Sequence, residues 1–282
     1  MKELFSGGAG ILVGHPLDTV KTRLQTIQGY TGMLDCMKKT VRQESLFGLY
    51  KGMFMPVMSA GVIHSLLFAG YGIALRQLHK NESNVEARKD LPMLEILFAS
   101  TCGTLLQVAP VVPIELVKTK LQVQRENVSH FVAHSKNLYA GPWECIRDTV
   151  RHEGVKGLFK GGSVVLSRDV ISYMFYIPVY EGVLRTFRKY DLEGTAAHLL
   201  AGGIAGVFAW ITVCPLEVLK CRIQSDKSHL PIKASALAKE IYRAEGMKAF
   251  FRGAVALCIR GFVVNAAIFV VYEKTVHHVS KL

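Results

Sequence analysis

Three stretches of the sequence place an acid two residues after a proline and a base three residues after the acid. The acids and bases are Asp18 with Lys21, Glu115 with Lys118, and Glu217 with Lys220. Residues three apart share one face of an α-helix, so each stretch presents a carboxylate beside an ammonium group. In a ring of three such helices each acid can meet the base of a neighbour. We expect the pairs Asp18–Lys118, Glu115–Lys220 and Glu217–Lys21.

The summed free energy of three such ion pairs is small enough for a gate that must open repeatedly. An ion pair beside water is worth about 0 to 1 kcal/mol, so three supply a few kcal/mol at most. Binding of a substrate can offset that amount. The alternative is ordinary helix-end charges facing lipid headgroups, which a single copy would favour. Three symmetric copies favour a gate.

Charged residues inside apolar segments are costly and usually functional. The sequence has three of them, Arg168, Asp169 and Arg260. A guanidinium forks onto a carboxylate, which makes Arg260 the expected carboxylate clamp and Asp169 the expected partner of a cation. Adjacent residues on a helix point about 100° apart, so we expect Arg168 and Asp169 to pair poorly with each other. Mutual neutralisation of the two is the alternative.

Three further residues are candidates for contact with the same substrate. Trp210 lies five residues before Pro215, and its ring face could bind a methylated ammonium by cation–π attraction. Packing is the alternative reading of this tryptophan. Ser59 holds the place in its segment that Arg168 and Arg260 hold in theirs. His64 stands at a position equivalent to Tyr173 and Asn265, and a structural hydrogen bond is its alternative role.

Long apolar runs must position these residues. Half of the 282 residues are hydrophobic, which is high for a soluble protein. Several runs reach the length needed to cross a bilayer, and we expect six spans, two in each repeat. They are Leu4–Leu17, Met53–Leu75, Ile96–Ile114, a run from Gly161 that Arg168 and Asp169 interrupt, Gly194–Leu216, and Gly261–Tyr272 extended backwards across Arg260.

The formal charge of +12 fits contact with anionic lipid. Nucleic acid is not an expected partner, because the basic residues cluster at the ends of apolar runs without a recognition motif. The six cysteines show neither a CxxC pair nor zinc-ligand spacing. We therefore expect structural thiols, no metal and no cofactor.

The proline motif recurs at intervals of about 100 residues, which predicts three repeats over 1–78, 92–189 and 194–279. Each repeat is expected to contain a short amphipathic helix between its two spans, over Met33–Glu44, Pro142–Glu153 and Ala234–Glu245. A glycine in the left-handed conformation then ends the helix, at Gly154 and Gly246, and the first repeat has Ser45 where this glycine is expected. An aromatic–base–glycine triplet begins the next span.

With both signatures present three times, the whole chain resembles the mitochondrial carriers, solute carrier family 25. The resemblance implies an all-α, integral-membrane bundle of six transmembrane helices with three-fold pseudo-symmetry and three short matrix-side helices. It also implies multi-pass insertion in the mitochondrial inner membrane, a monomer, bound cardiolipin and one central substrate site reached from alternate sides. Gln25, Gln122 and Gln224 match the family positions that brace the gate pairs.

The family also expects an aromatic–acid–x–x–base motif on each even-numbered helix, where it forms a cytosolic gate. This chain keeps only the acids Glu181 and Glu273, and leucine or valine replaces all three bases. The cytosolic gate is therefore expected to be weak. We expect the state closed to the matrix to be favoured at rest, with exchange relaxed toward net transport.

The arginine–acid pair on the fourth span and the arginine on the sixth are similar to those of carnitine, acylcarnitine and basic amino acid carriers. The expected cargo is a small amine that also carries a carboxylate. An acylcarnitine or choline-like cation is the alternative, and a non-transporting membrane scaffold is an alternative of another class. An enzyme is not expected, because no nucleophile–base, metal or phosphate-loop motif is present.

Overall fold

The computed structural model describes residues 2–79, 91–124, 139–190, 194–226 and 232–264, and these ranges contain helices and no strands. In each repeat a short helix lies between two long helical segments along the chain, and residues 254–264 begin the last of these. The elements are α1 (Lys2–Thr26), α2 (Met33–Glu44), η1 (Leu46–Tyr50), α3 (Phe54–Leu78), α4 (Met93–Val123), α5 (Pro142–Gly157), α6 (Gly162–Lys189), α7 (Thr195–Ser225), α8 (Ala234–Glu245) and η3 (Met247–Phe251).

Within the described ranges, three helical segments are long and apolar enough to cross a membrane, judged by length and composition. They are Leu46–Leu78, Met93–Val123 and Leu200–Ser225. The 28-residue α6 is also long, but it carries the charges of Arg168, Asp169 and Glu181. The sixth expected span continues past residue 264, and so lies only partly within the described residues.

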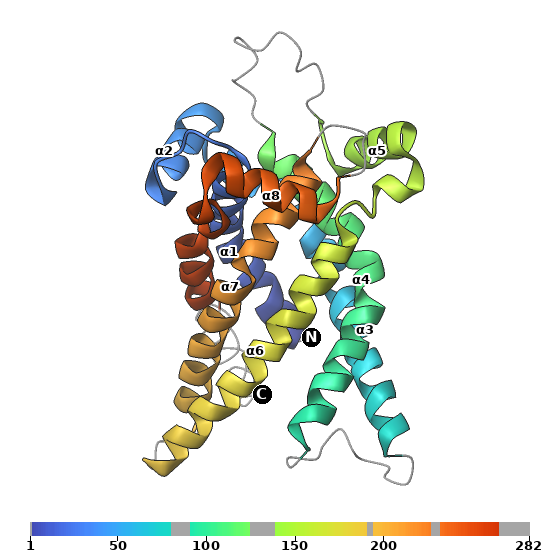
Figure 1. Ribbon diagram of the computed structural model, residues 1–282, viewed down its shortest axis with the longest axis vertical. Helices are drawn as coiled ribbons and strands as arrows, with labels where there is room; N and C mark the ends of the chain where they lie inside the picture. Colours follow the sequence, from blue (N-terminus) through green and yellow to red (C-terminus); the bar gives the residue numbers. More distant parts are fainter. Residues whose placement is uncertain (1, 80–90, 125–138, 191–193, 227–231, 265–282) are drawn as a thin grey trace, which may run out of the picture.

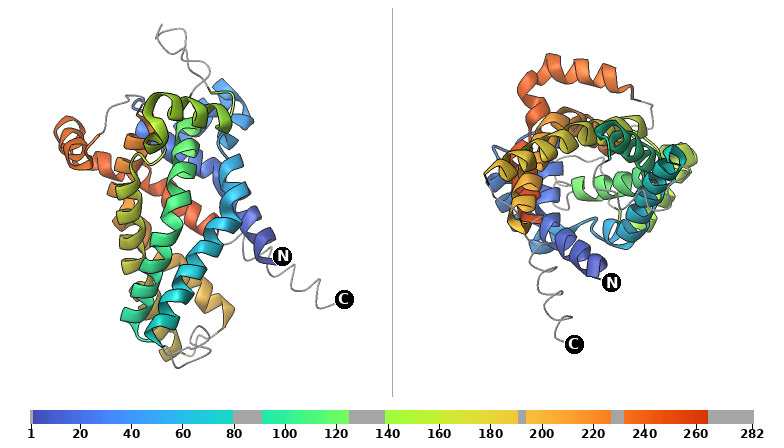
Figure 2. Two further views of the ribbon diagram at one scale, coloured as in Figure 1. Left: turned by 90° about the vertical axis from the view of Figure 1, so that its right-hand side faces the viewer. Right: turned by 90° about the horizontal axis from the view of Figure 1, so that it is seen from below.

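The long helices pack as neighbours around a central axis (Figures 1 and 2). α3 runs along α4 and α6 runs along α7, while α1, α4 and α7 contact one another. Small residues allow close approach: a Cβ added to Gly70 on α3 would lie 2.8 Å from the Cα of Gly103 on α4. At the lower end of Figure 1 the pair α3–α4 diverges from the pair α6–α7.

The short helices α2, α5 and α8 all lie at the opposite end of the bundle, which is the upper end in Figure 1. We call this the matrix end, after the side on which the family resemblance places such helices. The bounds of α2 and α8 are those predicted, and α5 runs on to Gly157 across a break at Gly154. The two predicted glycine stops are left-handed, with φ of 69° at Gly154 and 75° at Gly246, and Ser45 adopts a positive φ of 63° in place of the expected glycine.

Candidate functional site

The three proline-containing helices α1, α4 and α7 bring their charged residues together in a ring at the matrix end. Lys118 Nζ lies 2.6 Å from Asp18 Oδ2, Lys220 Nζ lies 3.1 Å from Glu115 Oε2, and Lys21 Nζ lies 2.5 Å from Glu217 Oε1. These are the three pairs that the repeat symmetry predicts. Each pair joins two different helices, so the ring ties all three together.

The ring is largely withdrawn from solvent. The Lys118 and Glu115 side chains are 20% and 24% exposed, whereas the two residues of the Glu217–Lys21 pair are only 2% and 7% exposed. Removing one partner from a pair this deeply buried leaves an uncompensated charge, which costs far more than the pair itself contributes. Between the helices lies a cavity of about 100 Å³, which we call the ring cavity. Its lining consists of the six ring residues with Thr22, Thr119, Gln122, Arg168, Trp210 and Arg260.

Arg168 is part of this charged network. Its Nη1 lies 3.1 Å from Glu115 Oε1 and 2.9 Å from Glu217 Oε2. Its Nη2 lies 2.7 Å from Asp169 Oδ1. The expectation that Arg168 and Asp169 pair poorly was therefore wrong. A long arginine side chain can fold back over its own helix, so the 100° between adjacent residues does not keep the two groups apart.

Arg260 and Trp210 meet beside the ring. The guanidinium carbon of Arg260 lies 5.9 Å from the centroid of the Trp210 ring, and Lys21 Nζ lies 5.7 Å from it. Arg260 also forms an ion pair with Asp18. Cation–π attraction of this kind is worth about 0.5 to 2 kcal/mol. Two cations of the protein thus use the aromatic surface that the sequence analysis assigned to a substrate.

A second and larger cavity, of about 330 Å³, adjoins the first through Trp210. We call it the aromatic cavity. It lies among α4, α6 and α7, and it combines one carboxylate with several rings. Its lining consists of Gln107, Asp169, Ser172, Tyr173, Tyr176, Gly202, Gly206, Ala209 and Trp210. This pairing of a carboxylate with aromatic faces suits an ammonium group.

The structure does not bring Ser59 and His64 to either cavity. The Ser59 hydroxyl donates to the carbonyl of Met55 at 2.7 Å, within its own helix. His64 is exposed on α3. Glu181 lies half-buried on α6, far along the helix from Arg168, and Glu273 and Asn265 lie outside the described residues. The substrate candidates that do converge are Arg168, Asp169, Trp210 and Arg260.

The three glutamines are not bonded as expected. Gln122 accepts from the Thr22 hydroxyl at 3.0 Å and donates to Thr19, while Gln224 accepts from Thr119 at 3.3 Å. The amide of Gln25 is buried without a hydrogen-bond partner in the described structure. Gln122 and Gln224 therefore bond to hydroxyls of the adjacent helix rather than to the ion pairs. Cys221 stands where the other repeats have Thr22 and Thr119, so Gln25 lacks a hydroxyl.

A further set of charges, which the sequence analysis did not single out, ties the short helices to the ring helices. Arg23 lies 2.8 Å from Glu44, Lys120 lies 3.7 Å from Glu153, and Arg222 lies 2.5 Å from Glu245. The signal was present, since each base follows a ring lysine by two residues and each acid ends a predicted short helix. We call these three pairs the outer pairs.

Two acids of the outer pairs have perturbed ionisation. Burial opposes ionisation of Glu44, but hydrogen bonds from Arg23 and Lys51 outweigh it and hold the Glu44 pKa below its usual value. The pKa of Glu245 is lowered chiefly by hydrogen bonds from Arg222. Both carboxylates are therefore charged at neutral pH and keep the short helices attached.

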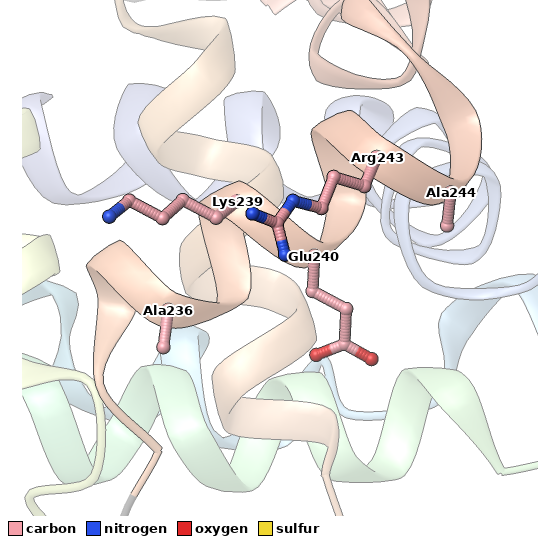
Figure 3. A pocket seen from close by; sticks show the side chains of 5 residues that line it. All are labelled: Ala236, Lys239, Glu240, Arg243 and Ala244. Carbon is pink, nitrogen blue, oxygen red and sulfur yellow. The ribbon is translucent and has the colours of Figure 1, made fainter.

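A hollow of about 500 Å³ lies over α8, away from the ring (Figure 3). Lys239, Glu240 and Arg243 project from the helix around it, together with Ala236 and Ala244, and all five residues are exposed. It has no buried polar group that could hold a ligand in a fixed orientation. The candidate site is therefore the pair of cavities at the centre of the bundle.

A membrane-spanning helical bundle with buried charges around a central polar cavity defines a solute transporter of the membrane. The family model "Mitochondrial carrier protein" matches residues 4–82, 89–191 and 192–282. The chain therefore belongs to the mitochondrial carrier family, whose members are transporters in the mitochondrial inner membrane.

Several curated relatives align with almost the whole chain. Solute carrier family 25 member 45 of Mus musculus is 39% identical, covering 95% of this chain and 94% of the relative. Member 47-B of Danio rerio is 37% identical, covering 96% and 95%. The mitochondrial carnitine/acylcarnitine carrier protein of Rattus norvegicus is 31% identical, covering 97% and 92%.

Proposed function

We propose that this carrier moves a small amine that also bears a carboxylate, such as a basic or methylated amino acid or a carnitine-like compound. The observation that carries the proposal is the shared wall of the two cavities. Trp210 lines both of them, with Asp169 on one side and Arg260 on the other. A zwitterion can therefore place its two charges on opposite sides of one tryptophan.

The amine end belongs in the aromatic cavity. Asp169 supplies the counter-charge, and Tyr173, Tyr176 and Trp210 supply ring faces. A methylated ammonium is weakly hydrated and gains from ring faces through cation–π attraction. An unmethylated ammonium can instead donate hydrogen bonds to the Asp169 carboxylate.

The carboxylate end of the substrate belongs beside Arg260, because the cations of the two cavities outnumber their carboxylates. Among the described residues, the two cavities hold five cations, Lys21, Lys118, Lys220, Arg168 and Arg260. They hold four carboxylates, Asp18, Glu115, Glu217 and Asp169. A substrate carboxylate meets the unbalanced positive charge, whereas a substrate with only a cation adds to it.

This excess argues against a choline-like cation as cargo. An acylcarnitine retains a carboxylate and a quaternary ammonium and stays as an alternative, supported by the 31% identity to the carnitine/acylcarnitine carrier of Rattus norvegicus. A non-transporting scaffold has no need for charged groups at the centre of the bundle, so the buried ring makes it the weaker alternative.

In the proposed cycle the ring is the matrix gate, and the described structure is the state closed on that side. Binding of a substrate offsets part of the free energy that holds the gate closed, and the ring helices then separate. We propose that the protein works as a monomer, and that its three repeats, 1–78, 92–189 and 194–279, together form one substrate site. The basic ends of the helices suit anionic lipid, with cardiolipin as the expected species.

Uptake into liposomes tests the proposal. The candidates are lysine, ornithine, methylated lysines, carnitine, short acylcarnitines and choline, each measured with wild type, Asp169→Asn and Arg260→Ala. We expect both variants to reduce uptake at least tenfold, with the exposed Arg185→Ala as the matched control. Unchanged uptake in both variants would remove the site assignment, and fast choline uptake without response to carboxylate-bearing amines would overturn the substrate class.

A thermal-shift measurement in detergent gives an independent readout. A true substrate binds only the folded state and raises the melting temperature by mass action. We expect amines with a carboxylate to raise it in wild type and to lose the effect in Asp169→Asn. Stabilisation by dicarboxylates or nucleotides instead would point to another cargo.

A further inference from the structure

The ring helices meet at three seams, namely α1–α4, α4–α7 and α7–α1. Two seams have an arginine that reaches across to the main chain of the next helix. Arg23 Nε donates to the Gln122 carbonyl at 2.9 Å, and Arg222 Nε donates to the Gln25 carbonyl at 3.0 Å. Each of these arginines also holds the acid of an outer pair, so one side chain secures three elements.

The α4–α7 seam has a lysine at the equivalent position. Lys120 Nζ reaches the Thr149 hydroxyl at 3.0 Å and Glu153 at 3.7 Å, both on α5. A lysine has one terminal donor group in place of the forked guanidinium, so it does not also serve the facing carbonyl. The ring pair at this seam is the longest of the three, at 3.1 Å, and its Lys220 is also drawn to Glu217 on its own helix at 3.4 Å.

A different arginine occupies this seam. Arg168 lies on α6, which packs against both α4 and α7. Its Nη1 binds Glu115 of α4 and Glu217 of α7, and Arg168 is only 7% exposed. The guanidinium therefore bridges the two helices that Lys120 leaves without an arginine clamp.

We propose that Arg168 is a positioning residue that clamps the α4–α7 seam and links the substrate site to the gate. The clamp replaces, at this seam, the arginines at positions 23 and 222. The link runs through Asp169, which lines the aromatic cavity and holds Arg168 Nη2 at 2.7 Å. A substrate cation on Asp169 competes with Arg168 for that carboxylate, which loosens the guanidinium from the seam. The link rests on the proposed function, whereas the clamp does not.

A second-site rescue tests the clamp in the absence of any substrate. Arg168→Gln removes the bridge and leaves Glu115 and Glu217 with one cation fewer. We expect the substrate-free melting temperature to fall by roughly 5 °C or more. Lys120→Arg restores at the seam the side chain that the other two seams have, so the double variant should recover at least half of the loss. Arg185→Gln is the matched control, because it removes the charge of an exposed arginine on the same helix.

Alkylation of Cys221 provides a second readout of the closed ring, since this thiol is 1% exposed beside Lys220. In a background with the other five cysteines replaced, Arg168→Gln should speed alkylation at least threefold, and Lys120→Arg should slow it again. Should Arg168→Gln be too unstable to purify, Arg168→Lys gives the same comparison with a smaller loss.

The result that overturns the proposal is an Arg168→Gln variant with wild-type substrate-free stability and wild-type Cys221 alkylation, which loses only the thermal shift by substrate. That pattern would make Arg168 a direct ligand. Failure of Lys120→Arg to restore either readout would also reject the clamp. Because both readouts need no substrate, a wrong substrate class leaves them unchanged, and the two proposals fail separately.

Discussion

The two ends of the bundle are held together by different kinds of interaction. At the matrix end, three helices are joined by buried ion pairs, with outer pairs fastening the short helices. At the opposite end, the positions where the family expects bases on α3 and α6 hold Leu75 and Leu184, which are 0% and 4% exposed. Both leucines are buried and uncharged, so neither can form the ion pair that a gate on this side would need.

Two polar contacts at that opposite end join neighbouring helices. His79 pairs with Glu95 at 2.7 Å, linking α3 to α4, and Tyr180 bonds to His198 at 2.9 Å, linking α6 to α7. Ion pairs thus tie three helices together at the matrix end, whereas each of these two contacts at the opposite end joins one pair of helices.

The largest expected effect comes from breaking the matrix end at its centre. Glu217 binds Lys21, Lys220 and Arg168. Glu217→Gln leaves three cations with one carboxylate fewer, at a cost of about 3 to 5 kcal/mol. We expect the melting temperature to fall by roughly 10 °C and exchange in liposomes to be lost. Glu240→Gln on the exposed face of α8 is the control, and a wild-type melting curve for Glu217→Gln would contradict a gate held by charge.

The next effect strengthens the same end. Cys221→Thr supplies the hydroxyl that the buried Gln25 amide lacks, as Thr22 does for Gln122. One net hydrogen bond contributes about 1 kcal/mol, so the melting temperature should rise by about 3 °C. Cys221→Val has the shape of threonine without its hydroxyl and should give no rise. Equal melting temperatures for the two variants would show that Gln25 is satisfied in another way.

A smaller effect is expected at the opposite end. Leu184→Lys returns one of the missing bases, on the same helix face as Glu181. Leu184 is 4% exposed, so moving the new ammonium group out of apolar surroundings offsets part of the ion pair's gain, which is at most about 1 kcal/mol beside water. The ratio of net uniport to exchange should therefore fall by about threefold at most. Leu184→Met keeps the position apolar and serves as the control. If wild type shows no uniport at all under a gradient, the expectation of relaxed exchange is wrong.

The smallest effect concerns acidification of the matrix side. The pKa values of Glu44 and Glu245 are lowered in the folded state, so their contribution to stability is present above the ordinary glutamate pKa and is lost as the pH falls through the lowered values. We expect melting temperatures to be flat from pH 8 to 6 and to decline below about pH 4.5. Glu44→Gln should flatten part of that decline, and an unchanged slope would exclude Glu44 as a cause.

Much of the fold followed from local patterns. The bounds of α2 and α8 were predicted because amphipathic spacing and a left-handed stop residue are encoded within a few positions. The ring pairs were predicted because three-fold repetition turns a local spacing into a tertiary contact. The outer pairs were present in the same motifs but were overlooked, since their acids lie in other elements.

Errors arose where a side chain had more than one partner within reach. Asp169 was expected to be free for a substrate, but the long Arg168 side chain folds back onto it. The glutamines were expected on the ion pairs, but threonine hydroxyls of the next helix lie at hydrogen-bond distance. Ser59 and His64 each occupy a position equivalent to that of a candidate residue in the other repeats, yet α3 does not bring them to the cavities.

The repeats, the short helices, the family and the ring pairs can be predicted from the sequence, because each depends on a spacing along the chain or on its repetition. Which charges share a partner depends on how the helices pack. Arg168 reaches two helices from a third, and Trp210 lines two cavities, because their neighbours come from elements that are distant in the sequence. A buried charge pairs with whatever the packing brings within a few ångströms, and no local pattern encodes that choice.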